Sequence, residues 1–471
     1  MEKKKTGRKN SVSEKTISKA KPITLLSIIC SFMAFLLILT FLRFPMGIKD
    51  FNSVLGAINL DYDLEGGTAY TLELASDNIE EVDDINGVLS TLRNRLNELG
   101  YQSYSVKALK STEEGVEDYA IRIEVESSTP GVDKSEVESK VDNDIRAVAA
   151  YGELTIIGGT SNSDANPEIL TEQKAVANAK YSGTYEDTYG ETKYLVTITF
   201  TDYGYNSIIE LINESASSES STGFYMGFKL GETTLLPQSE IKATSFSGKS
   251  LVIESTTLSA AKQMALQIKT GGLAYKYDVE KAIEDKVDVT SPYGKNVAVK
   301  CVVAIALLVV LFIVAYALLY KGYAIVAGLS LLAFILLETL MMIAVPGIIL
   351  SIGGVVGIAF STVLTAICLA LTANAIKSEL AKTEKTVKAG VKSGYKASVI
   401  AIVNIFVTLG IASLCLFFFN IGVLKSFATT FGIGCVVGII SALVFAKMFA
   451  SLVMPIANYS EKFLGIKRVE E

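Results

Sequence analysis

A single carboxylate interrupts the apolar C-terminal part of the sequence. Glu338 lies in the run AFILLETLMMIAVPG, and it is the only acidic residue within the five long apolar stretches that follow residue 296. A carboxylate at membrane depth is costly, so it marks a functional site by default. We treat Glu338 as a candidate proton carrier. The structural alternative, a carboxyl that reaches the headgroups or bonds a nearby Ser or Thr, stays open.

Other polar side chains in these stretches suit contacts between helices. We predict a polar seam, meaning a row of polar side chains between the fourth and fifth spans, made of Thr372, Asn374, Asn404 and Thr408. Such a seam either takes part in a proton relay or makes ordinary hydrogen bonds across helices in lipid. Cys368, in the fourth span, is expected to be a small buried residue rather than a redox centre.

The composition argues against an enzyme. The chain has no histidine, which removes the commonest general base, the commonest zinc ligand and every Ser-His or Cys-His dyad. Its five cysteines all lie in apolar runs and form no CxxC pair, so neither a disulfide framework nor a metal site is indicated. We expect no enzymatic activity, no metal and no cofactor.

Six transmembrane helices must position these residues. The apolar residues of the 471-residue chain concentrate in 23–45 and 297–457, and a span needs about 20 of them to cross ~30 Å of hydrocarbon. The run over 22–45 is longer than the core of a cleaved leader and is not followed by a small-residue cleavage site, so we expect an uncleaved anchor. The other spans are expected near 297–319, 323–345, 348–372, 397–419 and 428–456.

Charged residues at the ends of the spans predict their orientation. The tail 1–21, the Lys-rich turn 377–396 and the C-terminal tail 458–471 all carry clustered Lys or Arg. Six spans bring the three segments to one side, which the positive-inside rule makes cytoplasmic. The lysines of the turn either fix this topology or bind anionic lipid or an acidic partner. Because the basic residues flank spans, no nucleic-acid partner is expected.

The polar segment 46–295, which carries most of the acidic residues, then lies outside the cytoplasm. Its first part follows the order β-α-β-β-α-β, which predicts a ferredoxin-like sheet with two helices on one face. The expected strands are 67–74, 103–109, 117–126 and 153–158, and the expected helices are 82–100 and 134–152. The fold class is therefore an α-helical membrane bundle of six transmembrane helices plus a large α+β extracytoplasmic domain with ferredoxin-like βαββαβ elements.

Four motifs in order along the chain resemble the SecD/SecF family of bacterial preprotein translocase subunits. They are LDYDLEGGTAYTLEL (60–74), LRNRLNELG (92–100), SFSGKSLVIE with QIKTGGLAYKY (245–254 and 267–277), and LCLFFFNIGVLKSFATTFGIGCVVGIISAL (414–443). In the first motif, Asp63, Leu64, Gly66 and Gly67 match the family pattern. The resemblance covers about residues 46–457 and implies the fold of the resistance-nodulation-division superfamily.

The resemblance also implies an organisation and a set of partners. The external domain would divide into a base (46–158 and 245–295) and a head-like insertion (159–244), above a five-helix segment (296–457). The protein would be a multi-pass accessory subunit in the bacterial cytoplasmic membrane, with both termini inside. It would hold unfolded preproteins that emerge from the SecYEG channel and pair with a SecF-like subunit among the membrane lipids. The proton gradient would be the candidate energy source.

The sequence departs from the family in the fourth span, where the family carries an Asp. Aligning KTVKAGVKSGY with the family segment places that Asp at Cys368, and a second expected carboxylate falls at Asn404. We therefore expect weak coupling to protons, or coupling through Glu338 or the partner. Two alternatives stay open: a small-molecule or lipid exporter of the same superfamily, which a single six-span unit disfavours, and a non-transporting membrane scaffold.

Overall fold

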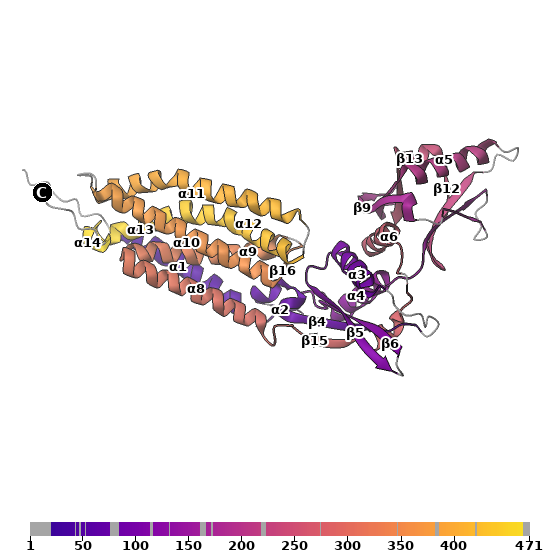
Figure 1. Cartoon of the computed structure of the whole chain (residues 1–471). Helices are drawn as coiled ribbons and strands as arrows, with labels where there is room; N and C mark the ends of the chain where they lie inside the picture. The colour runs from indigo at the N-terminus through magenta and orange to yellow at the C-terminus, as the bar shows by residue number, and fades with distance from the viewer. Residues whose placement is uncertain are drawn as a thin grey trace, which may run out of the picture.

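The computed structural model shows a long helical bundle joined end to end to a two-lobed α+β domain (Figure 1). The last described helix, α14 (Glu461–Leu464), lies at the end of the bundle away from this domain. Most of the expected tail 1–21 and the last part of the tail 458–471 lie outside the described residues. The structure describes residues 20–42, 44–46, 49–51, 53–75, 84–113, 116–130, 132–160, 166–170, 173–217, 223–273, 275–345, 347–381, 386–419 and 422–464.

Six helical segments of the described chain are long and apolar enough to cross a membrane, which confirms the predicted number of spans. Because the bilayer offers no water, a span must satisfy its backbone groups internally, and these apolar runs do so as helices. The central helix, α10, packs on α8, α9, α11 and α12, whereas α1 contacts mainly α13. The segments are α1 (Ala20–Phe41), α8 (Val297–Tyr320), α9 (Tyr323–Ala344), α10 (Ile352–Ala381), α11 (Val387–Phe417), and α12 (Gly422–Ile440) continued through a π-helical turn (Ser441–Phe445) into α13 (Ala446–Ile456).

The segment 377–396, which the sequence predicted to be a turn, is largely helical. α10 continues to Ala381 and α11 begins at Val387. Lys, Glu and Ala are good helix formers, so the two helices extend past the apolar part of their sequences. Lys377 Nζ donates to the carbonyl of Leu319 at 2.7 Å, which fastens this end of α10 to α8.

The lobe next to the bundle is a ferredoxin-like unit, which we call the base. Its sheet has the order β15-β4-β6-β5 with antiparallel neighbours. Helices α3 and α4 cover this sheet around a core that includes Tyr70, Leu92 and Ile123. Its elements are β4 (Gly66–Leu72), α3 (Ile85–Leu99), β5 (Tyr104–Glu113), β6 (Val116–Val125), α4 (Lys134–Val148), α7 (Val279–Glu284) and β15 (Val287–Thr290).

The fourth strand of this sheet is not the one that the sequence pattern predicted. The predicted strand 153–158 corresponds to β7 (Leu154–Gly159), which joins a different sheet. The chain leaves the base after α4, builds the second lobe, and returns through α7 and β15, which pairs with β4. Periodicity identifies a strand but does not say which strand lies beside it.

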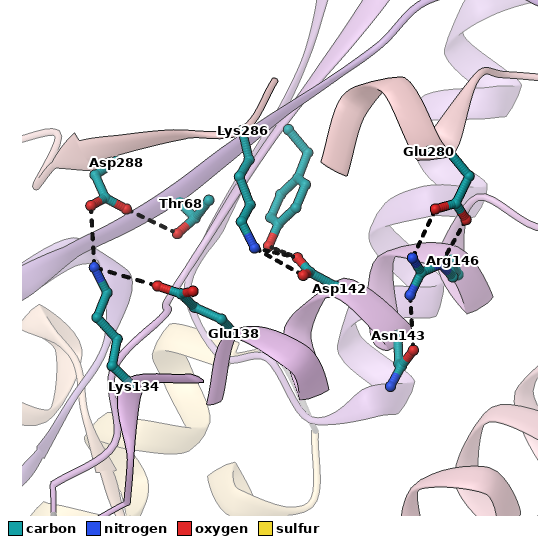
Figure 2. Close-up of polar contacts among 10 residues, drawn as sticks. Thr68, Lys134, Glu138, Asp142, Asn143, Arg146, Glu280, Lys286 and Asp288 are labelled. Carbon is teal, nitrogen blue, oxygen red and sulfur yellow. Dashed lines mark hydrogen bonds and ion pairs between the residues drawn. The ribbon is translucent and has the colours of Figure 1, made fainter. Parts of the chain in front are cut away.

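Ion pairs hold the returning segment against α4 (Figure 2). Lys286 Nζ lies 2.8 Å from Asp142 Oδ2, and Arg146 Nε lies 2.7 Å from Glu280 Oε1. Arg146–Glu280 is largely exposed and Lys286–Asp142 is half-buried, and pairs at a protein surface contribute only about 0–1 kcal/mol each. Their role is therefore to place α7 and β15 beside α4 rather than to supply much stability.

The second lobe, which we call the head, has two four-stranded sheets with the orders β12-β11-β7-β8 and β13-β14-β10-β9. The two sheets share one core with α5 and α6, and this core runs from Leu154 to Ile268. The head is therefore longer than the expected 159–244, because β14 and α6 bury their apolar faces in it. Its remaining elements are β8 (Glu168–Leu170), β9 (Val176–Glu186), β10 (Thr192–Phe200), α5 (Asp202–Ser217), β11 (Phe224–Leu230), β12 (Thr233–Ile241), β13 (Phe246–Ser247), β14 (Ser250–Ser255) and α6 (Leu258–Thr270).

A buried guanidinium connects base and head. Arg95 of α3 donates to the carbonyls of Val148 and Ala150, where the chain leaves the base, and to that of Gly271, where it returns. Carbonyls at the C-terminal ends of α4 and α6 carry partial negative charge, so they stabilise the cation without a carboxylate. Burial lowers the pKa of Arg95 to about 10, which leaves it charged at neutral pH.

Candidate functional site

Glu338 faces the interior of the bundle, between α9, α10 and α12. Ser361 Oγ of α10 donates to Glu338 Oε1 at 2.8 Å. A Cβ at Gly434 of α12 would stand 2.5 Å from the same oxygen, so only glycine lets α12 approach this closely. Glu338 precedes the end of α9 by six residues, which places it about 9 Å along the helix from the base-facing end.

The second oxygen of this carboxyl is unpaired. Glu338 Oε2 is buried without a hydrogen-bond partner among the described residues, as is Thr365 Oγ1, one turn deeper on α10. Buried polar atoms are normally paired, and the demand is strongest where no water reaches them. A carboxyl that merely bonded a neighbouring hydroxyl would account for Oε1 but not for Oε2. The geometry therefore makes Glu338 the candidate site inside the membrane.

The other predicted positions do not gather around Glu338. Cys368 is buried in a separate apolar cluster with Phe406 and Cys435. Thr372 Oγ1 lies 3.3 Å from Ser398 Oγ of α11, so a polar contact does join the fourth and fifth spans. Of the four residues expected to form this seam, only Thr372 takes part in this contact.

The remaining three residues of the expected seam, Asn374, Asn404 and Thr408, lie on exposed faces of α10 and α11. None of them has a side-chain hydrogen bond within the part of the chain that the structure describes. The buried face of α11 includes Ile402 and Phe406. Asn404 is two residues from each, which turns it about 200° away from them around the helix.

The joint between bundle and base is built by the motif around Asp63. Strand β3 (Asn59–Leu60) pairs in parallel with β16 (Ile349–Leu350), and the short helix α2 (Tyr62–Glu65) follows β3. Asp63 Oδ2 then accepts a hydrogen bond of 2.7 Å from the backbone N–H of Ile352, the first residue of α10. The first N–H groups of a helix have no partner within it, and a carboxylate also suits the helix dipole there. Asp63 therefore caps a helix 289 residues further along the chain.

The other motif residues shape the same joint. Gly66 has a φ of 98°, and a Cβ there would overlap the backbone of β15, while a Cβ at Gly67 would overlap the backbone of β6. The two glycines therefore let β4 begin tightly between its neighbours. Leu64 fills a small apolar core between base and bundle. Its neighbours in this core are Ile58, Val297 and Leu350.

A further carboxyl, Asp61, is fully buried at this joint. Its Oδ1 accepts a hydrogen bond of 2.8 Å from the N–H of Tyr62. Burial, followed by the charges of Glu126 and Asp63, raises the pKa of Asp61 to about 9. Burial also raises the pKa of Glu126 to about 7. The joint therefore holds protons at neutral pH.

Sequence reasoning did not single out Asp61, Ser361 or Gly434 as site residues. Asp61 precedes Asp63 by two residues in LDYDLEGG, and this repeated acid next to apolar residues was the available signal. The approach of Ser361 and Gly434 to Glu338 depends on the packing of three helices. Nothing in the spacing of these residues indicates it.

Solved structures share this fold. The crystal structure of SecDF in a super-membrane-facing form aligns with 96% of this chain at a TM-score of 0.68 and 19% identity. This chain spans 59% of that SecDF chain. This protein thus shares the fold of SecDF over its helical bundle and its two-lobed α+β domain.

Curated SecD subunits are similar to this chain over most of its length. The protein translocase subunit SecD of Synechocystis sp. is 24% identical over 423 residues, which cover 82% of this chain and 87% of the relative. SecD of Dictyoglomus turgidum is 24% identical over 420 residues, which cover 86% and 92%. No family model matches the chain. The match to these SecD subunits over most of both chains confirms the resemblance that the motifs predicted.

The raised pKa of Asp61 leads to a prediction about pH. The pKa of Asp61 is about 9 in the folded state and 3.8, the ordinary value, in the unfolded chain, so between these values the folded state binds more protons. The protonated Asp61 therefore contributes to the free energy of unfolding in full below pH 3.8, and this contribution is lost as the pH rises through about 9. Asp61→Asn imitates the protonated carboxyl and keeps the acceptor for Tyr62. The melting temperature of the full chain in detergent should fall from pH 5 to pH 9 in the wild type and fall less in Asp61→Asn.

The control is Asp84→Asn, at an exposed cap of α3 in the same lobe. This variant should keep the pH profile of the wild type. A profile for Asp61→Asn that coincides with the wild type would show that Asp61 holds no proton in the folded state at neutral pH.

Proposed function

We propose that this protein is an accessory subunit of the Sec protein translocase that helps move preproteins across the bacterial cytoplasmic membrane. The observation that carries the proposal is the match to SecD translocase subunits over most of both chains. The two-lobed domain holds the emerging, unfolded chain outside and limits its backsliding. The protein acts without an enzymatic reaction of its own, and its substrate leaves the SecYEG channel.

The orientation that we propose places both termini in the cytoplasm. The end of α10 and the start of α11, whose sequences include Lys377 and Lys388, lie at the end of the bundle away from the base, as does the last described helix, α14 (Glu461–Leu464) (Figure 1). Clustered basic residues favour the cytoplasmic side. The base and head then lie outside, where a preprotein emerges.

The exposed polar face of α10 and α11 supports a partner subunit. Asn374, Asn404 and Thr408 are exposed there beside apolar side chains such as Ile400 and Ile411. An amide that faced lipid would lack hydrogen-bond partners, whereas polar groups of a neighbouring helix would supply them. We propose that a SecF-like subunit covers this face. The longer SecDF chain, of which this protein spans 59%, supports such a pairing.

In this proposal Glu338 takes up and releases the proton that couples this subunit to the proton gradient. Its burial and its unpaired oxygen support this role. Two further hydroxyls lie in the α10–α12 interface on the side of the base: Thr430 Oγ1 donates to the carbonyl of Gly354, and Ser426 Oγ donates to that of Ile349. They provide polar groups between Glu338 and the outer surface.

Depletion of the protein tests the proposed function. Cells are depleted, and the maturation of a secreted precursor is followed by pulse-chase with and without an uncoupler. We expect precursor to accumulate, with no further delay when the uncoupler is added, because both treatments remove the same proton-driven step. A separate delay by the uncoupler would show assistance without coupling. Unchanged export would reject the translocase role in favour of the exporter or scaffold alternative.

The role of Glu338 predicts the behaviour of its neutral variant. Glu338→Gln keeps the shape and an acceptor for Ser361 but cannot exchange a proton, so it should slow export several-fold and make the remaining export insensitive to the uncoupler. Ser361→Ala, which removes the hydrogen bond to Oε1 but leaves the carboxyl of Glu338 in place, should have the smaller effect. Immunoblots confirm equal protein levels. Wild-type rate and uncoupler sensitivity in Glu338→Gln would exclude Glu338 as the proton carrier.

A further inference from the structure

We infer that Asp63 couples the base to the fourth span, so that the base sheet and α10 move as one body. Asp63 is a positioning residue in this account: it touches neither the proton site nor a substrate. It acts through the backbone at the start of α10. The mechanical part of this inference stands on the structure alone, and only its consequence for export rests on the proposed function.

The chain before Asp63 follows the chain before α10 residue by residue. Asn59 and Leu60 are the partners of Ile349 and Leu350 in the parallel pair of β3 and β16. The N–H of Asp61 then donates to the carbonyl of Leu350 at 3.0 Å. β16 ends at Leu350 and α10 begins at Ile352. There the side chain of Asp63, instead of a backbone carbonyl, accepts the hydrogen bond from the N–H of Ile352. The contact between the two chain segments thus continues from the pair of β3 and β16 to the N-terminal cap of α10.

The chain after Asp63 leads directly into the base. Two residues separate Asp63 from β4, which lies inside the sheet next to β15 and β6. The Oγ of Ser291 donates to the backbone carbonyl of Asp63 at 2.6 Å, and Ser291 lies between β15 and α8. Asp63 therefore lies where a central strand of the base, the connection to α8 and the start of α10 meet. Figure 1 shows its helix, α2, between the bundle and β4.

The other end of this connection is the proton site. Ser361, which donates to Glu338, lies on α10 nine residues after Ile352. The backbone hydrogen bonds of α10 connect these two residues turn by turn. In this inference, a shift of α10 at Ser361 therefore also moves the start of the helix. Through Asp63 the displacement passes to β4 and the base sheet.

The first test measures this coupling without export. Full-length protein in nanodiscs, with its five cysteines replaced by alanine, carries spin labels at the exposed positions Ser139 on α4 and Val356 on α10. Asp63→Ala should widen the distance distribution between the labels by about twofold or more, because the cap is lost. Asp63→Asn should keep the width of the wild type, because its amide oxygen still accepts from Ile352.

The matched control is Asp84→Ala. It removes the cap of α3, where Asp84 Oδ1 accepts from the N–H of Gly87 at 2.8 Å, so it weakens a helix of the base and leaves the hydrogen bond between Asp63 and α10 intact. The control should leave the distance distribution unchanged. An Asp63→Ala distribution as narrow as that of the wild type would overturn the inference, and so would an equal widening in the control.

The second test connects the joint to transport. Asp63→Ala should slow precursor export several-fold, and a disulfide between Asn59→Cys and Ile349→Cys, which are paired positions of β3 and β16, should restore it when oxidised but not when reduced. Slow export that the disulfide fails to restore would overturn the mechanical role of Asp63 in transport. A widened distribution with normal export would keep the joint and contradict the proposed function instead.

Discussion

The start of α10 imposes the constraint on which the rest of the structure depends. This helix begins at the border between bundle and base, where its first N–H groups need acceptors that the helix cannot supply. Asp63 of the base accepts from Ile352, Ser351 accepts from Gly354, and Ser426 of α12 accepts from Ser351. Two of these three acceptors lie on other elements, so the cap fixes the base and α12 around the central helix.

At the other end of the base a side chain also caps helix ends, but here a cation meets backbone carbonyls. Asp63 brings a negative group to the N–H end of α10, and Arg95 brings a positive group to the carbonyl ends of α4 and α6. The base therefore lies between two joints, one toward the bundle and one toward the head. In each joint a buried ionisable side chain meets backbone dipoles directly. A lobe held in this way can pass a displacement of α10 to the head.

Length and hydropathy were sufficient to predict the six spans, because crossing lipid demands long apolar helices. Periodicity was also sufficient for α3, whose buried positions Val88, Leu92 and Leu96 lie on one face. Three features escaped prediction because they depend on packing between distant segments. Pairing of β15 with β4 joins two segments that the whole head separates in the sequence. Glu338 points into the bundle and Asn404 points outward because of how each helix is rotated about its own axis. A span that is apolar on all sides gives no pattern from which this rotation can be predicted.

The account rests on an external domain that holds a preprotein in transit, and site-specific photo-cross-linking tests this most directly. A photoreactive residue is placed at exposed positions of the head, such as Tyr189 and Val252, and at exposed Ile325 of α9 as a control. A secreted precursor is then arrested during export. The account predicts cross-links from the head positions to the arrested precursor, none from Ile325, and none after the precursor has been released. Head positions that never cross-link to the arrested precursor would contradict it.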